Sequence, residues 1–385
     1  MKVTIGEKLI IGFLLVISLM IILGIFALQN SSILLTRVLG EGSIVLASQS
    51  LSQIDQSIYQ QMERLKRYSQ TQAVQAHLLE SNNEYKLKGA STQEYINAQD
   101  QAWRAASPDI ETPFMMAIQS NQLSDDLREQ FIDYFKRRDG YHIIKEIFMT
   151  NAYGVNVAQN QKTSDYYQAD EEWWQTARDN TFFVGDIEYD ESANEYLLTI
   201  AIRVDDHNGN FAGVIKALAN TEVLIQESEI ANPSAGLTLL TDKGQIIYST
   251  NPFTFLGEYP NTELIKTITG NQQGYSVTSE EGKEKLISYA HSRGFRYFPG
   301  LNWTLLVSND TDVVFEPLTN LKRNLLFASL LVGLVGLITA LVVSRLIGKP
   351  LRKITEGARM ISAGNLDATI SVRSHDELGE LADAF

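Results

Sequence analysis

The sequence contains no cysteine among its 385 residues. A chain without cysteine cannot be held together by disulfides, and it cannot bind a metal through thiolates. Any folded unit must therefore be stabilised by a buried apolar core, and 44% of the residues are apolar. The length exceeds that of one small domain, so we expect two or three folded units.

Motifs for catalysis are missing as well. The five histidines, at positions 77, 142, 207, 291 and 375, have no spacing typical of a metal site. The sequence has neither a Gly-x-Ser-x-Gly nucleophile motif nor a phosphate-binding glycine loop. We therefore expect no catalytic residue, no metal and no cofactor. An extracellular enzyme anchored to the membrane and an adhesin are kept as weaker alternatives for the function of the chain.

Two apolar runs without charged residues cover residues 9–28 and 325–344. Each has about 20 residues, which as a helix is roughly 30 Å long and enough to cross a bilayer. The first run could be a signal peptide, but it is longer than the usual apolar core of one and lacks a convincing small-x-small cleavage site. We predict two transmembrane helices in a multi-pass protein of the cell membrane.

The charges beside these runs predict the orientation. Basic residues precede the first run and follow the second: Lys2 and Lys8, then Arg345, Lys349, Arg352 and Lys353. Positive charge concentrates on the cytoplasmic side, so we expect both termini in the cytoplasm and residues 29–324 outside. That outer segment has 24 Lys and Arg against 39 Asp and Glu, a net charge of −15. Such acidity argues against a nucleic-acid partner.

The outer segment begins with a helical pattern and continues with strands. Apolar residues recur every three or four positions over residues 43–79, which predicts a stalk helix spanning about residues 30–80. Two similar strand hairpins follow, closed by Gly154 and, 90 residues later, by Gly244. We therefore expect two copies of one α+β fold, a distal lobe over residues 81–230 and a proximal lobe over residues 231–312.

The segment behind the second apolar run has the pattern of two short helices joined by an extended connector. The first helix starts at a proline, which suits a first helical turn, and its apolar residues have heptad spacing. A glycine ends this helix, and an acidic pair marks the start of the second helix. Seven residues carry this pattern and its predicted role in signal relay: Pro350, Leu351, Ile354, Gly364, Leu366, Glu377 and Leu378.

This segment, residues 345–385, resembles the HAMP domain, most specifically in the GNL turn and in DELGELADAF. The resemblance implies a homodimer in which a parallel four-helix coiled coil relays motion from the membrane to a cytoplasmic output. The second helix is shorter than is usual in that family. We therefore expect a truncated receptor whose output domain is missing.

The long helix, the two lobes, the membrane helix and the HAMP-like segment together resemble the double Cache receptors of bacteria and archaea. The stretches that carry the resemblance are TNAYGVNVA, TSDYYQADEEWW, GDIEYDES, NGNFAGVIKALAN and LNWTLLV. The resemblance implies PAS-like antiparallel sheets and a small-molecule pocket in the distal lobe. From it we expect a two-component sensor histidine kinase, with a methyl-accepting chemotaxis receptor or a nucleotide or cyclic-dinucleotide cyclase sensor as the alternative.

The sequence departs from the relatives that bind amino acids, which carry an Arg-x-Trp-Tyr-x-x-Ala pattern. Alignment on Trp173 and Trp174 places Glu171 where that pattern has its arginine. A later aspartate of these relatives, five residues after Gly213, is replaced by Leu218. Because the arginine would hold a carboxylate, ordinary amino-acid binding through this contact is not expected.

The stretch TSDYYQADEEWW, residues 163–174, combines four aromatic rings with four carboxylates. Between residues 165 and 191 there are nine acids and one base, Arg178. Aromatic rings beside carboxylates attract cations, so we predict a pocket for a small cationic or amine-bearing ligand. Lys216 could neutralise an acid there or hold an anionic ligand. The predicted ligand-binding residues are Asp165, Tyr166, Tyr167, Asp170, Trp173, Trp174, Asp190 and Lys216.

Two other interpretations of this stretch are open. A helix over residues 166–177 would place Tyr166, Asp170 and Trp173 on one face. The structural alternative is that the tryptophans pack against a sheet while Ser164 or Asp165 caps the helix. The nearby DIEYDES also permits calcium, although it lacks the alternating spacing of an EF-hand loop.

Overall fold

The computed structural model describes residues 5–106, 112–190, 193–222, 225, 235–280, 282–365, 369, 371–372, 374 and 376–384. Gly40–Asn309 form one compact unit, and Met1–Leu39 with Asp310–Phe385 form another. The first unit, called the sensor unit below, contains both lobes. The second, called the membrane unit, contains the two apolar runs and the C-terminal segment.

The sensor unit starts with the stalk. The helix α1 (Ile5–Ser69) continues from the first apolar run without a break. Its buried residues confirm the predicted helical period: Ala47, Leu51, Ile54, Ile58, Met62 and Leu65. The helix ends at Ser69, before the boundary predicted near residue 80, and α2 (Gln72–Leu87) follows. Gln75 holds the intervening turn, because its Nε2 donates to the carbonyl oxygens of Ser69 and Asp205 at 2.9 and 2.8 Å.

The distal lobe is built on a five-stranded sheet in which neighbouring strands are antiparallel. The strands occur across the sheet in the order β2-β1-β5-β4-β3. In chain order they are β1 (Ile144–Asn151), β2 (Asn156–Gln159), β3 (Phe182–Asp190), β4 (Glu195–Asp205) and β5 (Phe211–Ala219).

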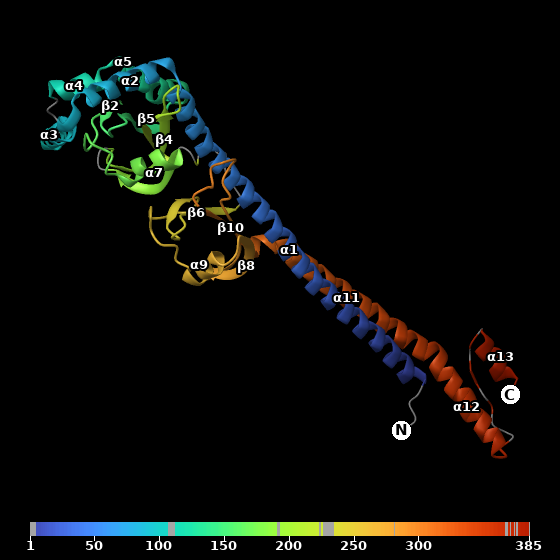
Figure 1. The fold of residues 1–385 in the computed structure, drawn as a ribbon. Coiled ribbons are helices and arrows are strands. Elements are labelled where there is room, and N and C mark those ends of the chain that lie inside the picture. Colours follow the sequence, from blue (N-terminus) through green and yellow to red (C-terminus); the bar gives the residue numbers. More distant parts are fainter. Residues whose placement is uncertain are drawn as a thin grey trace. The chain divides into compact units, whose positions relative to one another are not determined.

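Helices cover both faces of the distal sheet (Figure 1). α1, α2 and α5 (Gln122–Leu127) pack on the face that contains Ile147 and Ile215, whereas α7 (Glu172–Asn180) packs on the face that contains Phe148 and Val214. The helical part between α2 and the sheet comprises η1 (Gly89–Ser91), α3 (Thr92–Ala105), α4 (Pro113–Gln119), α5 (Gln122–Leu127), η2 (Arg128–Asp133) and α6 (Tyr134–Asp139).

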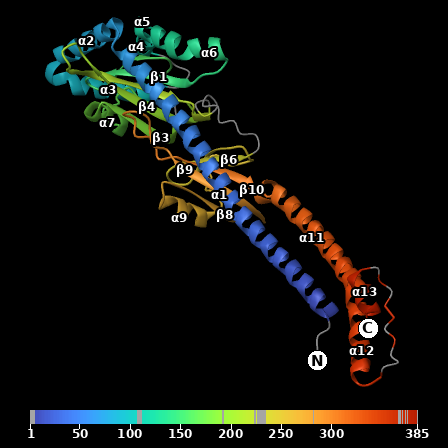
Figure 2. The same ribbon diagram turned by 90° about the vertical axis from the view of Figure 1, so that its right-hand side faces the viewer.

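The proximal lobe repeats this design. Its strands occur in the order β7-β6-β10-β9-β8, which is the distal order with each strand replaced by its counterpart. The predicted duplication is therefore confirmed. The helix α9 (Thr262–Thr269) packs on one face of this sheet through Leu264 and Ile268 (Figure 2). The strands are β6 (Gly236–Leu240), β7 (Ile246–Ser249), β8 (Gln273–Glu280), β9 (Lys283–His291) and β10 (Thr304–Asp310).

The membrane unit is helical throughout its regular structure. α1 and α11 (Glu316–Val343) carry the two apolar runs, and the helices that contain them are long and apolar enough to cross a membrane. The remaining elements are α10 (Thr311–Val314), η3 (Ser344–Gly348), α12 (Lys349–Ser362) and α13 (Glu377–Asp383).

The predicted relay residues fall on this pattern. Pro350 and Leu351 lie in the first turn of α12, and Ile354 is buried one turn later. Gly364 follows the helix with a φ of 96°, a backbone conformation that residues other than glycine rarely adopt. Leu366 lies outside the described residues.

The second short helix begins where the acidic pair predicts. Glu377 is the first residue of α13, and the backbone N–H of Leu378 donates to Oδ1 of the capping residue Asp376 at 3.0 Å. That carboxylate also accepts a hydrogen bond from Ser374, and these bonds lower the pKa of Asp376. The start of α13 is thus fixed by local side-chain chemistry.

Candidate functional site

Residues 163–171 of the acidic aromatic stretch are not helical, because their backbone groups are bonded elsewhere. The N–H of Asn156 donates to the oxygen of Tyr166 at 3.1 Å. The N–H groups of Tyr166 and Tyr167 donate to Oδ1 of Asp100 on α3, at 2.9 and 3.1 Å. The helix α7 begins only at Glu172. The open interpretation of a helix over residues 166–177 therefore does not hold for its first half, and neither Ser164 nor Asp165 caps α7.

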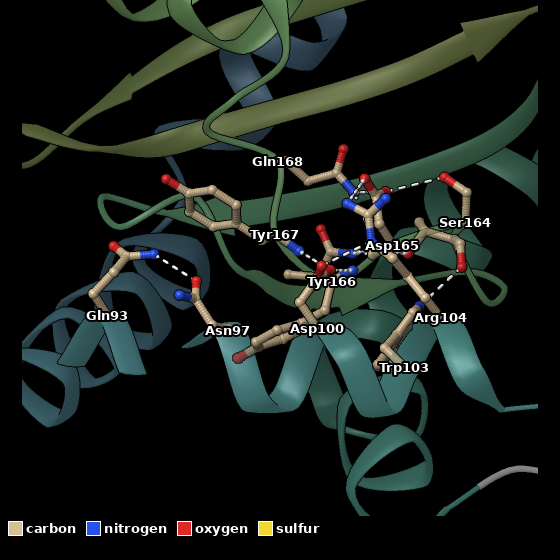
Figure 3. Close-up of polar contacts among 12 residues, drawn as sticks. Gln93, Asn97, Asp100, Trp103, Arg104, Ser164, Asp165, Tyr166, Tyr167 and Gln168 are labelled. Carbon is tan, nitrogen blue, oxygen red and sulfur yellow. Dashed lines mark hydrogen bonds and ion pairs between the residues drawn. The ribbon is translucent and has the colours of Figure 1, made fainter. Parts of the chain in front are cut away.

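Asp165 lies at the centre of a closed polar network (Figure 3). Its carboxylate accepts hydrogen bonds from Arg104 Nη2 at 3.1 Å, Ser164 Oγ at 3.0 Å and Gln168 Nε2 at 2.6 Å. Arg104 also donates to Asp100 at 2.7 Å, so the guanidinium joins two acids. The side chain of Asp165 is buried, and burial raises its pKa against the opposing effect of Ser164 and Arg104.

Tyr166 and Trp174 use their polar atoms inside the core. The hydroxyl groups of Tyr166 and Tyr85 are hydrogen-bonded to each other, and burial raises the pKa of Tyr85 to about 12. Trp174 Nε1 donates to Thr150 Oγ1 on β1 at 2.8 Å. Both tryptophans of the stretch are buried against the sheet, Trp173 on Phe148 among others. The alternative interpretation, in which the two tryptophans pack against a sheet, is therefore correct on this point.

Four polar groups beside this core have no such partners. Within the described part of the chain, the Tyr167 hydroxyl and the carboxylates of Asp170 and Glu171 make no hydrogen bond or ion pair. Figure 3 shows the ring of Tyr167 pointing away from Asp165. On β5, Lys216 Nζ makes ring contacts rather than ion pairs there, 4.7 Å from the ring centroid of Trp173 and 5.5 Å from that of Phe148.

Desolvation and the charges around Glu171 shift the pKa of its carboxyl group. Glu171 is exposed, but partial desolvation by its neighbours raises its pKa, and the charges of Asp165 and Asp170 raise it further. The positive charges of Lys216 and Arg104 act in the opposite direction. The five charged groups therefore form one cluster in which the acids outnumber the bases.

Asp190 is the predicted residue that lies apart from this cluster. It is the last residue of β3, and its Oδ1 accepts a hydrogen bond from the N–H of Ala193 at 2.9 Å. Along β4, Asp190 pairs with Glu195 and Lys216 with Ala201, which separates them by six residues, or about 20 Å. No group of three or more metal-binding side chains is found among the described residues.

Asp100 and Arg104 are members of the site that the sequence analysis missed. They lie on α3, more than 60 residues before their partners. Their spacing of four on a helix, which allows an ion pair, was the available signal. It did not show which acid across the fold they would meet.

A second polar contact joins the stalk to the proximal lobe. Asp55 on α1 is 3% exposed, and its carboxylate accepts hydrogen bonds from Ser292 Oγ at 2.7 Å and the N–H of Gly294 at 2.9 Å. Burial raises the pKa of Asp55. Further along the same loop, Trp303 Nε1 donates to Asp186 on β3 at 3.0 Å. Residues 292–303 thus contact the stalk and the distal lobe together.

Comparison with known proteins identifies the architecture. Residues 41–318 match the Cache domain family, which is most of the chain. The chain belongs to this family. Residues 342–385 match the HAMP domain, so both resemblances seen in the sequence are confirmed. A Cache domain, a HAMP segment and two helices able to span a membrane together give the architecture of a transmembrane sensor receptor.

Several known proteins are similar to this Cache receptor. It is 26% identical over 198 residues to the methyl-accepting chemotaxis protein TlpB of Bacillus subtilis, a match that covers 51% of the chain and 28% of TlpB. With TlpA of the same organism the identity is 24% over 273 residues, covering 68% of the chain and 38% of TlpA. The chain therefore spans less than two fifths of the length of these relatives.

Among solved structures, the chain is similar to sensor domains. The extracellular domain of the candidate histidine kinase soHK1S-Z6 superposes with a TM-score of 0.44 at 15% identity, covering 74% of this Cache receptor and 99% of that chain.

Proposed function

We propose that the distal Cache lobe binds a small amine-bearing ligand at the cluster around Glu171. The observation that carries the proposal is a set of polar groups without a hydrogen-bond or ion-pair partner among the described residues, namely the Tyr167 hydroxyl and the carboxylates of Asp170 and Glu171. Desolvation raises the pKa of both Tyr167 and Glu171, and these groups are close enough for the charge of Asp170 to raise both further. A carboxylate that has no protein partner is available to an ammonium group, and the neighbouring rings favour a cation.

Six of the predicted site residues, together with Glu171, which was not among them, then take one of two roles. Tyr167, Asp170, Glu171 and Trp173 contact the ligand. Asp165, together with Tyr166 and Trp174, positions them, because the polar atoms of these three side chains are already used within the protein.

Lys216 has a separate role in this proposal. Its ammonium group lies over Trp173 and partly offsets the acids, so it favours ligands that carry a hydrogen-bond acceptor as well as an amine. Asp190 lies about 20 Å along the sheet from Lys216 and is left without a ligand contact.

A titration on the full chain in lipid nanodiscs tests this site. Phenethylamine and putrescine are the probes, and succinate is the anionic comparison. Asp170→Asn and Glu171→Gln should each weaken amine binding by about 10-fold or more, since a hydrogen bond to a charged group contributes about 1.5–3 kcal/mol. Asp179→Asn is the matched control, because that acid lies on α7 and is paired with Arg178. Stronger binding of succinate, or equal losses in the control, would refute the assignment.

We further propose that the output is chemotactic. TlpA and TlpB are methyl-accepting chemotaxis proteins, which favours this output over the histidine kinase expected from the sequence. Both termini then lie in the cytoplasm, and two chains pair through the stripe that includes Leu351 and Ile354. The coding sequence beyond residue 385 decides between the outputs. A long coiled coil rich in Ala, Glu and Gln supports chemotaxis, and a phosphoacceptor helix with an ATPase domain supports the kinase.

A further inference from the structure

A cavity in the proximal lobe lies between α9 and the sheet. Its volume is about 180 Å³. The strands β6, β9 and β10 contribute Leu240, His291 and Thr304 to its walls, and α9 contributes Ile265 and Ile268. None of the residues predicted to bind ligand in the distal lobe lines it.

The charge of this cavity is set by one carboxylate. Asp242 and His291 are the ionisable side chains among its lining residues. The carbonyl oxygen of Ile268 lies 3.2 Å from His291 Nε2 and can only accept, so Nε2 carries a hydrogen. The Thr304 hydroxyl lies 2.7 Å from Nδ1 and can donate to it, which satisfies a neutral imidazole.

In contrast to His291, Asp242 has a carboxylate that makes no hydrogen bond or ion pair within the described ranges. The last turn of α9 also borders the cavity, and its carbonyl end carries partial negative charge. Lys243 and Lys266 belong to the adjoining turn and helix but do not line the cavity. The electrostatic environment therefore favours a cation, and the side chains of Leu240, Ile265 and Ile268 provide apolar contact.

We propose that this cavity is a second ligand site, which binds a small organic amine through Asp242. Its volume equals that of roughly six water molecules, so it admits an amine with a short apolar body. His291, in its wall, directly precedes Ser292, which donates to the buried Asp55 of the stalk. An occupant would thus lie one residue from the contact between proximal lobe and stalk, and would act on that contact independently of the distal site.

The test uses the full chain in lipid nanodiscs with the distal site disabled by Asp170→Asn and Glu171→Gln. Propylamine is the probe, and propionate, of similar size and opposite charge, is the comparison. We expect propylamine to bind at one remaining site and Asp242→Asn to weaken it at least 10-fold. Glu263→Gln is the matched control, since it removes the same charge from the exposed first turn of α9 and should leave binding unchanged.

A second variant tests the cavity without changing its charge. A Cβ at Gly270 would have the oxygen of Thr267 at 3.9 Å as its nearest neighbour, and the φ of Gly270 is −91°. Gly270→Leu should therefore fold normally and fill part of the cavity, with loss of propylamine binding. The proposal is overturned if propylamine does not bind the distal-site variant, if Asp242→Asn and Glu263→Gln have equal effects, or if propionate binds as tightly as propylamine.

Discussion

The contact between Asp55 and the loop at residues 292–294 leads to a quantitative prediction. In Asp55→Ala, Ser292 Oγ and the N–H of Gly294 lose their acceptor in a site where Asp55 itself is 3% exposed. Two hydrogen bonds to a charged group contribute about 1.5–3 kcal/mol each, and relief of the cost of burying the carboxylate reduces the net loss to roughly 2–3 kcal/mol. This cost of burial is also why the pKa of Asp55 is raised.

Hydrogen exchange measures this loss where it occurs. A local destabilisation of about 2–3 kcal/mol corresponds to roughly 30- to 150-fold faster exchange of the Gly294 amide. Peptides that cover residues 292–300, followed by mass spectrometry on the full chain, report it. Glu80→Ala, an exposed acid on α2, is the control and should leave these peptides unchanged. Unaltered exchange in Asp55→Ala, or acceleration spread evenly over both lobes, would show that this contact does not hold the loop.

Three further predictions concern the distal site, the distal sheet and the HAMP segment. Because the pKa of Glu171 is raised above 4.5, amine affinity should increase as pH rises from 4.5 through that pKa, and calorimetry should find a flatter profile in Glu171→Gln. A Cβ at Gly213 would lie 2.0 Å from the oxygen of Thr150, so Gly213→Ala should destabilise the distal lobe by about 1–3 kcal/mol in thermal unfolding. Gly42→Ala is the control and should cause no such loss, because no atom lies within 4 Å of a Cβ at Gly42. Gly379→Ala would bring its Cβ within 2.1 Å of the Ser374 oxygen, so under the proposed pairing of two chains, crosslinking across the HAMP segment should decrease.

Local sequence patterns determined much of the architecture. The apolar runs predicted α1 and α11 because length and composition alone decide whether a helix can span a bilayer. The hairpins closed by Gly154 and Gly244 were predictable because both turns need a positive φ, which is 79° in each. Their repetition indicated two similar sheets, and the identical strand order confirms it.

The same sequence could not decide the conformation of residues 163–171. Their spacing is compatible with a helix, but Asp100 on α3 takes the N–H groups of Tyr166 and Tyr167 from 66 and 67 residues away. A pattern within twelve residues contains no information about such a distant acceptor.

Tertiary structure also decided which acids are open. Composition identified an excess of carboxylates around Asp165 and Glu171 but could not rank them. Arg104 lies 61 residues before Asp165 and pairs with it, whereas Glu171 has no partner among the described residues. The charge that a ligand would meet depends on this pairing, because a carboxylate already bonded to a guanidinium offers less to an ammonium group than an open one. The sequence by itself determined that the segment is acidic and aromatic, and only the packing of α3 against it decided where that acidity is available.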